Sequence, residues 1–350
     1  MSINKCGIRM TVSQFQVFDD EMASYAKQLG IVNIQRNTPA LPGEKKWAFE
    51  DLKSLKDRIE RHGLKLVMIE NVPLIFYDKV ILGLPGRDEQ LENYCETIEN
   101  LGKLGIEIFG HHFSPTFVWR TDSDAPGRGG CTVTAFDKTC FADSSRTGNG
   151  MEEVMRRKRH LLNYDVFEVA RGMTEDDLFD NYKYFMKAVI PVAERCGVKL
   201  ALHMDDPPVK HFGEIDRMVT CLDDYKRAMA IANSPAWGAN LCLGCCSEAG
   251  GNAVVQEMLD FFLANNNLFS LHLRDVQGVL PKFQECWLGE GNFNPAEIID
   301  KLDKAGYTGL VMEDHVAKMV NDTVYGHRAR AHELGYIRGM IDMLDYKKQN

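Results

Sequence analysis

Four side chains that can bind a metal stand at the ends of four apolar, strand-like segments in the second half of the chain. They are His203, Cys242, His272 and Asp314. About 30 to 45 residues separate each from the next, which is the length of a repeating strand–helix unit. Because the carboxyl ends of parallel strands meet at one edge of a sheet, we expect the four side chains to lie together.

The donor types in this set fit a divalent metal. His and Cys suit zinc, iron or cobalt, whereas carboxylate and water suit manganese or magnesium. One thiolate and one carboxylate balance a divalent charge, and open positions remain for water or substrate, as in catalytic sites. The alternative is that each is an ordinary core residue, since a single buried Cys commonly packs as a small hydrophobic side chain. Four such residues at successive strand ends favour a metal centre.

Further polar residues stand at two of the predicted strand ends. Asp205 and Asp206 follow His203 and precede two prolines, which cannot continue a sheet ladder. We expect these carboxylates to orient a metal ligand or to bind substrate hydroxyls, and the alternative is a capped turn. His111 and His112 end an earlier strand. They are candidate substrate-binding residues, and the alternative is a packing role.

The elements that must position these residues alternate regularly along the chain. Eight apolar, strand-like segments alternate with eight helix-like segments, which predicts an α/β fold of the (β/α)₈ (TIM) barrel type. The alternative is an open, doubly wound sheet. The first strand is not followed by a glycine-rich phosphate loop, so we expect no dinucleotide site. The predicted strands span residues 7–12, 31–36, 64–70, 106–113, 199–206, 237–244, 269–276 and 309–314.

A long insertion interrupts this alternation after the fourth strand. Residues 114–172 are predicted to be largely irregular, with a basic, helix-like segment at Met151–Leu162. A connection of this length is usually functional or disordered. Because it leaves a strand end, we expect a lid or a pocket wall, and the alternative is an oligomer contact. We predict one barrel domain over residues 1–350 that contains this insertion.

Composition narrows the class of protein. The chain is 45% hydrophobic and 26% charged, which is ordinary for a globular protein. Its net charge of −9 and lack of a long basic run argue against nucleic acid as a partner. An anionic substrate must therefore meet local positive charge. We expect no membrane association, because no segment approaches the roughly 20 apolar residues of a membrane span and the amino terminus lacks a signal-peptide core.

Cysteine usage points to a reducing compartment. Ten cysteines in 350 residues are too few for a disulfide scaffold, which favours reduced thiols and a cytoplasmic location. Cys245 and Cys246 are interpreted as buried core residues.

Several motifs resemble the mannonate dehydratase family, which belongs to the xylose isomerase-like barrel superfamily. The segment beginning at His203, His-Met-Asp-Asp-Pro-Pro, resembles that family's His-Pro-Asp-Asp-Pro-Pro motif. The resemblance covers most of the chain. It extends to Leu82-Gly-Leu-Pro-Gly-Arg-Asp, Trp119-Arg-Thr-Asp, His272-Leu-Arg-Asp-Val, Glu313-Asp-His and Tyr325-Gly.

This resemblance implies a reaction and roles for individual residues. The metal would be manganese, with iron, cobalt or zinc as alternatives, held by the four residues named above. His315 and Tyr325 would be the acid–base pair, and Arg120 would meet the anionic end of the substrate. The reaction would be the dehydration of D-mannonate to 2-keto-3-deoxy-D-gluconate, by abstraction of the C2 proton and loss of the C3 hydroxyl.

The chain departs from the family pattern at positions that would contact substrate. Leu74-Ile-Phe-Tyr replaces a His-containing loop after the third strand, Met204 replaces a proline, and Val324 replaces the glycine before Tyr325. A different sugar acid, or a sugar isomerase or epimerase with the same enediolate chemistry, is therefore the main alternative. A zinc hydrolase and a barrel that binds a ligand without turnover are further alternatives. We expect a homo-oligomer.

Overall fold

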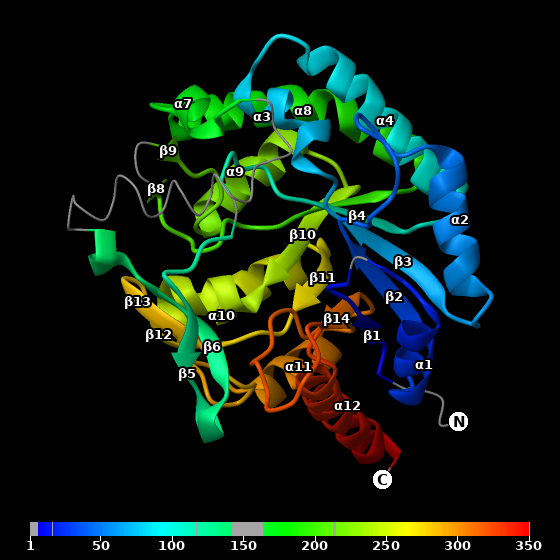
Figure 1. Cartoon of the computed structure of the whole chain (residues 1–350), viewed down its shortest axis with the longest axis vertical. Coiled ribbons are helices and arrows are strands. Elements are labelled where there is room, and N and C mark those ends of the chain that lie inside the picture. Colours follow the sequence, from blue (N-terminus) through cyan, green and yellow to red (C-terminus); the bar gives the residue numbers. More distant parts are fainter. Residues whose placement is uncertain (1–5, 16, 117, 142–163, 213–214, 350) are drawn as a thin grey trace.

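Eight parallel strands close into a barrel at the centre of the molecule (Figure 1). The computed structural model describes residues 6–15, 17–116, 118–141, 164–212 and 215–349. Neighbouring strands around the barrel are β1-β14-β11-β10-β7-β4-β3-β2, and β2 closes onto β1. Their bounds are β1 Arg9–Val12, β2 Asn33–Asn37, β3 Lys65–Glu70, β4 Ile108–His111, β7 Lys199–Leu202, β10 Trp237–Cys242, β11 Leu268–His272 and β14 Leu310–Met312.

Each barrel strand leads to a helix that packs outside the barrel. The predicted (β/α)₈ architecture is confirmed, and the doubly wound alternative is wrong because the sheet closes on itself. A short helix, α3 (Asp78–Leu82), precedes α4. The outer helices are α1 Asp20–Gln28, α2 Phe49–Glu60, α4 Arg87–Lys103, α8 Glu175–Cys196, α9 Leu222–Ala232, α10 Leu243–Ala264, α11 Pro295–Lys304 and α12 His327–Gln349.

The apolar spacing of these helices explains how they cover the barrel. In α4, Leu91, Tyr94, Ile98 and Leu101 recur every three or four residues and are all buried. This spacing places them on one face of the helix, which packs into the main hydrophobic core. The long helix α8 begins with a capping box from Thr174, whose side chain accepts from the backbone N–H three residues later.

The insertion is more regular than its sequence predicts. It contains the hairpin β5 (Asp122–Pro126) and β6 (Thr132–Asp137), so the expectation of an irregular segment is wrong for these residues. The hairpin joins β12 (Val276–Val279) and β13 (Lys282–Glu285) in an antiparallel sheet of order β12-β13-β6-β5. Period-2 alternation is weak in β5, which pairs with β6, and the second partner of β6 is β13, a strand far along the chain. The predicted helix at Met151–Leu162 lies outside the described residues.

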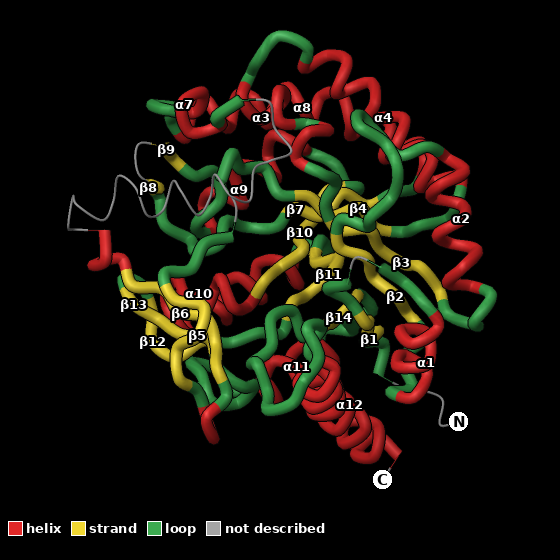
Figure 2. Tube along the Cα trace, viewed as in Figure 1, coloured by secondary structure: helices red, strands yellow, loops and turns green. Residues whose placement is uncertain are grey.

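This second sheet stands beside the barrel rather than within it (Figure 2). The segment after β11 supplies β12 and β13, and the segment after β4 supplies β5 and β6. Both segments leave the barrel at the carboxyl ends of its strands, so the small sheet is anchored at the end that carries the predicted site. The described part of the insertion also includes the short helix α7 (Val166–Ala170).

No helix within the described ranges is long and apolar enough to cross a membrane. All ten cysteines are free thiols.

Candidate active site

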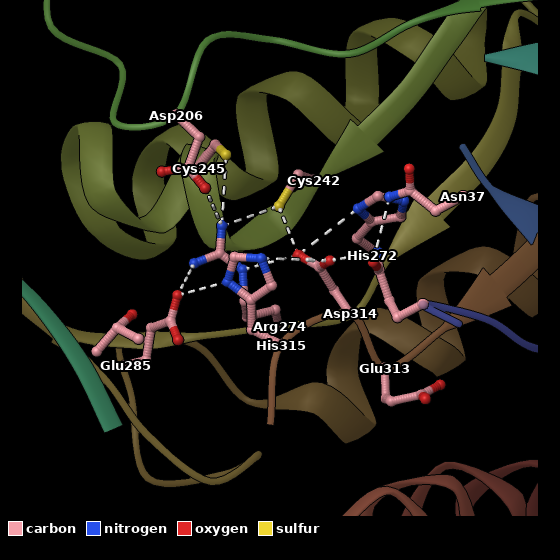
Figure 3. Close-up of polar contacts among 12 residues, drawn as sticks. Asn37, Asp206, Cys242, Cys245, His272, Arg274, Glu285, Glu313, Asp314 and His315 are labelled. Carbon is pink, nitrogen blue, oxygen red and sulfur yellow. Dashed lines mark hydrogen bonds and ion pairs between the residues drawn. The ribbon is translucent and has the colours of Figure 1, made fainter. Parts of the chain in front are cut away.

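The four predicted metal ligands lie at the carboxyl ends of the barrel strands, and Figure 3 shows three of them, Cys242, His272 and Asp314, turned toward one another. Cys242 and His272 end the neighbouring strands β10 and β11 and are direct register partners. His203 is the residue after β7, and Asp314 comes two residues after β14. All four side chains are buried, as expected for residues that line the inside of a barrel end.

The donor atoms of these residues form two close groups that meet at Cys242. Asp314 Oδ2 is 3.7 Å from Cys242 Sγ and 3.6 Å from His272 Nδ1. Donor atoms of His203 and Cys242 lie within 4.8 Å of each other, and the His203 and His272 ring centroids are 5.1 Å apart. Cys242 is therefore shared by two donor groups, one with His272 and Asp314 and the other with His203 and Cys245.

The histidine orientations in this set fit metal binding. His203 Nδ1 donates to the Met204 carbonyl at 2.6 Å, which fixes the tautomer and leaves the Nε2 lone pair available. Both ring nitrogens of His272 are buried and have no hydrogen-bond partner among the described residues. A buried imidazole without a hydrogen bond is unusual. Carboxylate oxygens of Asp314 and Glu70 lie 3.6 and 3.7 Å from its Nδ1 and Nε2, and a metal at the donor set would bond one of these nitrogens.

The charge of the donor set also fits a cation. Burial raises the pKa of the Cys242 thiol, but a hydrogen bond from Cys245 and the positive charge of Arg274 outweigh it and hold the pKa well below its usual range. Burial likewise opposes ionisation of Asp314, yet cationic neighbours keep its pKa well below the usual value. Both pKa directions favour the ionised forms that bind metals, in two buried side chains that face one another. Asp314 adopts a left-handed backbone with φ of 67°, and Gln14 Nε2 donates to its Oδ1 at 3.0 Å. Strained backbone of this kind is concentrated at functional sites.

Arg274 is a central residue of the site that the sequence did not reveal. Its Nε donates to Asp314 Oδ2 at 3.0 Å, and its Nη2 lies 3.2 Å from Cys242 Sγ. Its side chain is 1% exposed. Gly244 makes room for it, because a Cβ at that position would lie 2.4 Å from Arg274 Cζ. One signal in the sequence could have indicated this residue: Arg274 comes two residues after the proposed ligand His272, at the end of the same strand.

Arg274 continues into a buried network of carboxylates. Its Nη1 donates to Glu248 and Glu285 at 2.8 and 2.9 Å, and its Nη2 donates to Asp206 at 3.0 Å. Arg120, from the insertion, contacts the same three carboxylates, and its Nη2 lies 3.0 Å from Glu248 and 2.9 Å from Glu285. Arg120 and Asp206 therefore do reach the site. Both guanidinium groups are already paired with carboxylates there.

The two carboxylates of the Asp-Asp pair have different positions. Asp205 Oδ2 accepts from the Val219 backbone N–H at 3.0 Å, and its other oxygen faces Arg217 at 3.8 Å. These contacts fix the loop after β7. The capped-turn alternative thus describes Asp205, whereas Asp206 joins the network around Arg274.

His315 lies at the open edge of the site. Its Nδ1 is 2.7 Å from Glu285 Oε1, and its Nε2 is 3.8 Å from Asp314 Oδ1. The side chain is 34% exposed, whereas those of its two carboxylate neighbours are 7% and 6% exposed. Burial lowers its pKa, but Asp314 and Glu285 outweigh that effect and raise it to about 9.

Tyr325 approaches the barrel end from the loop before α12. Its hydroxyl donates to the Ser13 carbonyl at 2.7 Å, directly after β1. The ring packs edge-on against Phe15, and the Arg330 guanidinium lies 4.7 Å from its centroid. Burial raises the pKa of the Tyr325 hydroxyl well above its usual value, so the group is a neutral proton donor at neutral pH.

His111 does not join these residues, which corrects its predicted place in the site. Its Nε2 lies 3.4 Å from the Tyr182 hydroxyl, and its ring packs against Phe185 of α8. Burial lowers its pKa to about 3, so it is a neutral packing residue. Successive side chains along a strand face opposite sides. The next residue, His112, therefore turns inward, and its ring centroid is 4.2 Å from that of His203.

Glu70 is a further buried residue beside the donor set. It ends β3, and its Oε1 lies 3.7 Å from His272 Nε2. Amide groups of Asn240 and Gln35 donate to its two oxygens, each at 2.9 Å. Its place at a strand end was visible in the sequence. The amide partners that hold it were not, because they lie within strands and show no motif.

Three comparisons agree on the family. The D-mannonate dehydratase (UxuA) family model matches residues 11–350. A mannonate dehydratase of Geobacillus thermodenitrificans is 30% identical over 98% of this chain and 96% of its own. The crystal structure of mannonate dehydratase from Streptococcus suis serotype 2 matches with a TM-score of 0.83 and 27% identity, over 95% of this chain and 94% of that one.

A more distant structure shows the fold alone. A xylose isomerase domain protein from Planctomyces limnophilus matches with a TM-score of 0.55 and 15% identity, over 95% of this chain and 96% of that one. The resemblance predicted from the strand-end motifs is thus confirmed over nearly the whole chain. The chain belongs to the D-mannonate dehydratase family and is an enzyme of the hydro-lyase class.

Proposed function

We propose that this chain dehydrates D-mannonate to 2-keto-3-deoxy-D-gluconate with the help of a divalent metal. The observation that carries the proposal is the convergence of His203, Cys242, His272 and Asp314 at one barrel end, with His315 beside the last of them. The family relationship supports dehydration of a sugar acid as the reaction class.

The four converging residues would hold the metal. We propose Mn²⁺, and the mixed donor set also suits Fe²⁺, Co²⁺ or Zn²⁺. A divalent ion there would supply Lewis-acid chemistry, which makes a proton next to a carboxylate easier to remove. The unpartnered nitrogens of His272 and the available Nε2 of His203 support this assignment.

His315 is proposed to remove the C2 proton. Glu285 is hydrogen-bonded to Nδ1, so Nε2 is the ring nitrogen that faces Asp314 and is proposed to face the substrate. With the charge of Asp314 neutralised by a bound cation, His315 loses one of the two carboxylate fields that raise its pKa. The neutral imidazole needed for proton abstraction is then accessible near pH 7.

Tyr325 is proposed to assist departure of the C3 hydroxyl. A leaving hydroxide needs a proton, and the neutral Tyr325 hydroxyl can donate one. In the structure this hydroxyl is held by the Ser13 carbonyl, so substrate must offer a competing acceptor for the proton to be transferred.

The sugar-acid end and hydroxyls are proposed to meet the mixed network of Arg120, Asp206 and Arg274. Carboxylates that share a guanidinium can exchange one contact for a substrate hydroxyl without leaving a charge unpaired. We propose that His112, rather than His111, lines this space, because it faces His203. The small sheet would form a wall of the pocket, within one catalytic barrel unit over residues 1–350, since Arg120 precedes β5 and Glu285 ends β13.

A metal-restoration assay tests the proposal. The purified protein is stripped of metal, Mn²⁺ is restored, and D-mannonate is followed by a chemical test for 2-keto-3-deoxy acids. We expect product only with metal, and none from His315→Ala. The matched control is His62→Ala, which removes a histidine after α2 that faces Asp20. Bound metal without product from D-mannonate would assign the site to a different sugar acid or to an isomerase.

A further inference from the structure

A Cys-x-x-Cys sequence spans the end of β10 and the first turn of α10. Cys242 is the last residue of the strand and the N-cap of the helix, and Cys245 follows three residues later. Of these two cysteines, only Cys242 is a proposed metal ligand. The sequence predicts Cys245 to be a buried core residue, and it is one, but its sulfur also contacts Arg274 at the edge of the site (Figure 3).

The two sulfur atoms face each other across a short gap. The donor atoms of His203, Cys242 and Cys245 all lie within 4.8 Å of one another. One nitrogen of Arg274, Nη2, is 3.2 Å from Cys242 Sγ and 3.5 Å from Cys245 Sγ. Side chains three residues apart in a helix turn have Cβ atoms about 5–6 Å apart, whereas a disulfide requires roughly 3.5–4.5 Å, so Cys242 at the helix N-cap must move toward Cys245 by about 1–2 Å for the bond to form.

The adjacent thiol of Cys246 points elsewhere. Its Sγ lies 3.9 Å from Met204 Sδ, in the packing around β7. Of these two thiols, Cys245 is therefore the one placed to form a disulfide with Cys242. Cys246 is equally buried and serves as an internal comparison.

We propose that Cys242 and Cys245 are an oxidation site that forms a reversible disulfide when no metal is bound. The consequence for metal binding rests on the proposed function, because it requires Cys242 to be a ligand. Oxidation would convert that ligand into a disulfide sulfur, which cannot act as a thiolate. A bound ion would in turn protect Cys242, since its sulfur would be engaged.

The chemistry needs a small oxidant, and hydrogen peroxide is the class proposed. The Cys242 sulfur attacks one peroxide oxygen, the O–O bond breaks, and sulfenic acid and one water result. The Cys245 sulfur then attacks the Cys242 sulfur and expels the sulfenic oxygen as a second water. Two thiols are oxidised to one disulfide and one peroxide is reduced to two waters. Both thiols are 0% exposed, so only a small oxidant can reach them.

The test maps disulfides in the full-length protein with and without Mn²⁺. After hydrogen peroxide, remaining thiols are alkylated under denaturing conditions and the peptide 228–274 is fragmented by mass spectrometry. We expect a Cys242–Cys245 bond in the metal-free protein, its loss with dithiothreitol, and strong suppression by Mn²⁺. Isothermal titration should show at least a tenfold loss of Mn²⁺ affinity that dithiothreitol restores.

Two serine variants separate this role from general oxidation. In Cys245→Ser, Cys242 should proceed to sulfinic acid, and dithiothreitol should no longer restore Mn²⁺ binding. Cys246→Ser is the matched control and should behave as the parent. Cys245→Ala replaces the serine variant if the latter does not fold.

The outcomes also separate this proposal from the proposed function. The oxidation site would be overturned if Cys242 and Cys245 stayed reduced in a sample whose other thiols are oxidised. A Cys242–Cys246 bond would overturn it as well. Either result would leave the proposed metal centre intact. A Cys242–Cys245 bond that leaves Mn²⁺ affinity unchanged would refute its coupling to metal and also the assignment of Cys242 as a ligand.

Discussion

His315 Nδ1 lies 2.7 Å from Glu285 Oε1, which ties a residue after the last barrel strand to the end of a hairpin outside the barrel. The contact fixes the ring and leaves Nε2 toward the donor set. The small sheet thus orients the proposed base, although none of its strands belongs to the barrel.

Replacing Glu285 by Gln should lower the pKa of His315. Removing one of the two carboxylates that stabilise the imidazolium makes proton loss easier, so titration should move from about pH 9 to lower pH. The shift is measured by NMR of the histidine ring in metal-free protein. In the loaded enzyme, the limb of kcat/KM that rises with pH should move in the same direction. Glu290→Gln is the control, since Glu290 lies just after this hairpin and its carboxylate pairs with Arg128, away from His315. An unmoved limb would exclude His315 as the base.

The buried network around Glu285 should make the protein acid-labile. Burial raises the pKa of the Glu285 carboxyl, but the cations His315, Arg120 and Arg274 outweigh burial and lower it from 4.5 to about 2. A lowered folded-state pKa contributes stability that is fully present above pH 4.5 and is lost as pH falls toward 2. The shift corresponds to a contribution on the order of 3 kcal/mol.

Urea unfolding at several pH values between 7 and 2.5 measures this loss. The free energy of unfolding should fall less steeply with acid in Glu285→Gln than in the parent protein. Equal slopes for the two proteins would show that this carboxylate does not carry the acid sensitivity.

Replacing Glu70 by Gln should weaken metal binding without removing a ligand. The Glu70 carboxylate faces His272 Nε2 and favours the tautomer whose Nδ1 lone pair points to Asp314. Loss of such a partner typically lowers metal affinity 10–100-fold. Isothermal titration with Mn²⁺ checks this. Glu107→Gln is the control, because Glu107 pairs with Arg9 and Lys65 before strand β4, at the opposite end of the barrel. Unchanged affinity in Glu70→Gln would leave Glu70 with a purely structural role.

Replacing Tyr325 by Phe should slow turnover and leave metal binding intact. General acid catalysis contributes about 10²–10⁴-fold, so kcat should fall by at least 100-fold. Tyr25→Phe is the matched control, since the Tyr25 hydroxyl also donates to a backbone carbonyl, that of His327, in the same aromatic cluster. Equal kcat values for the two variants would remove Tyr325 from the mechanism.

The barrel and the meeting of the four strand-end side chains were predictable because their signals are local. An apolar segment followed by His203 or His272 spans fewer than about ten residues. A strand with a polar residue at its carboxyl end can therefore be predicted from that short stretch alone. The acid network was not predictable, because Glu248 lies in a helix and Glu285 in a hairpin, and only the folded chain brings them to Arg274. His111 was misplaced for a different reason. A one-residue error at a strand end reverses the face of the side chain, and the His-His pair gives no indication of which residue points inward.

The most direct test of the account is proton NMR of D-mannonate incubated in D₂O with the Mn²⁺-loaded protein. Removal of the C2 proton and loss of the C3 hydroxyl give an enol that takes up solvent deuterium at C3. If the chain dehydrates D-mannonate as proposed, the product is a 2-keto-3-deoxy acid with one deuterium at C3, and it forms only with metal. Recovery of a sugar acid that keeps its C3 hydroxyl and carries deuterium at C2 would contradict dehydration and assign the site to an epimerase or isomerase.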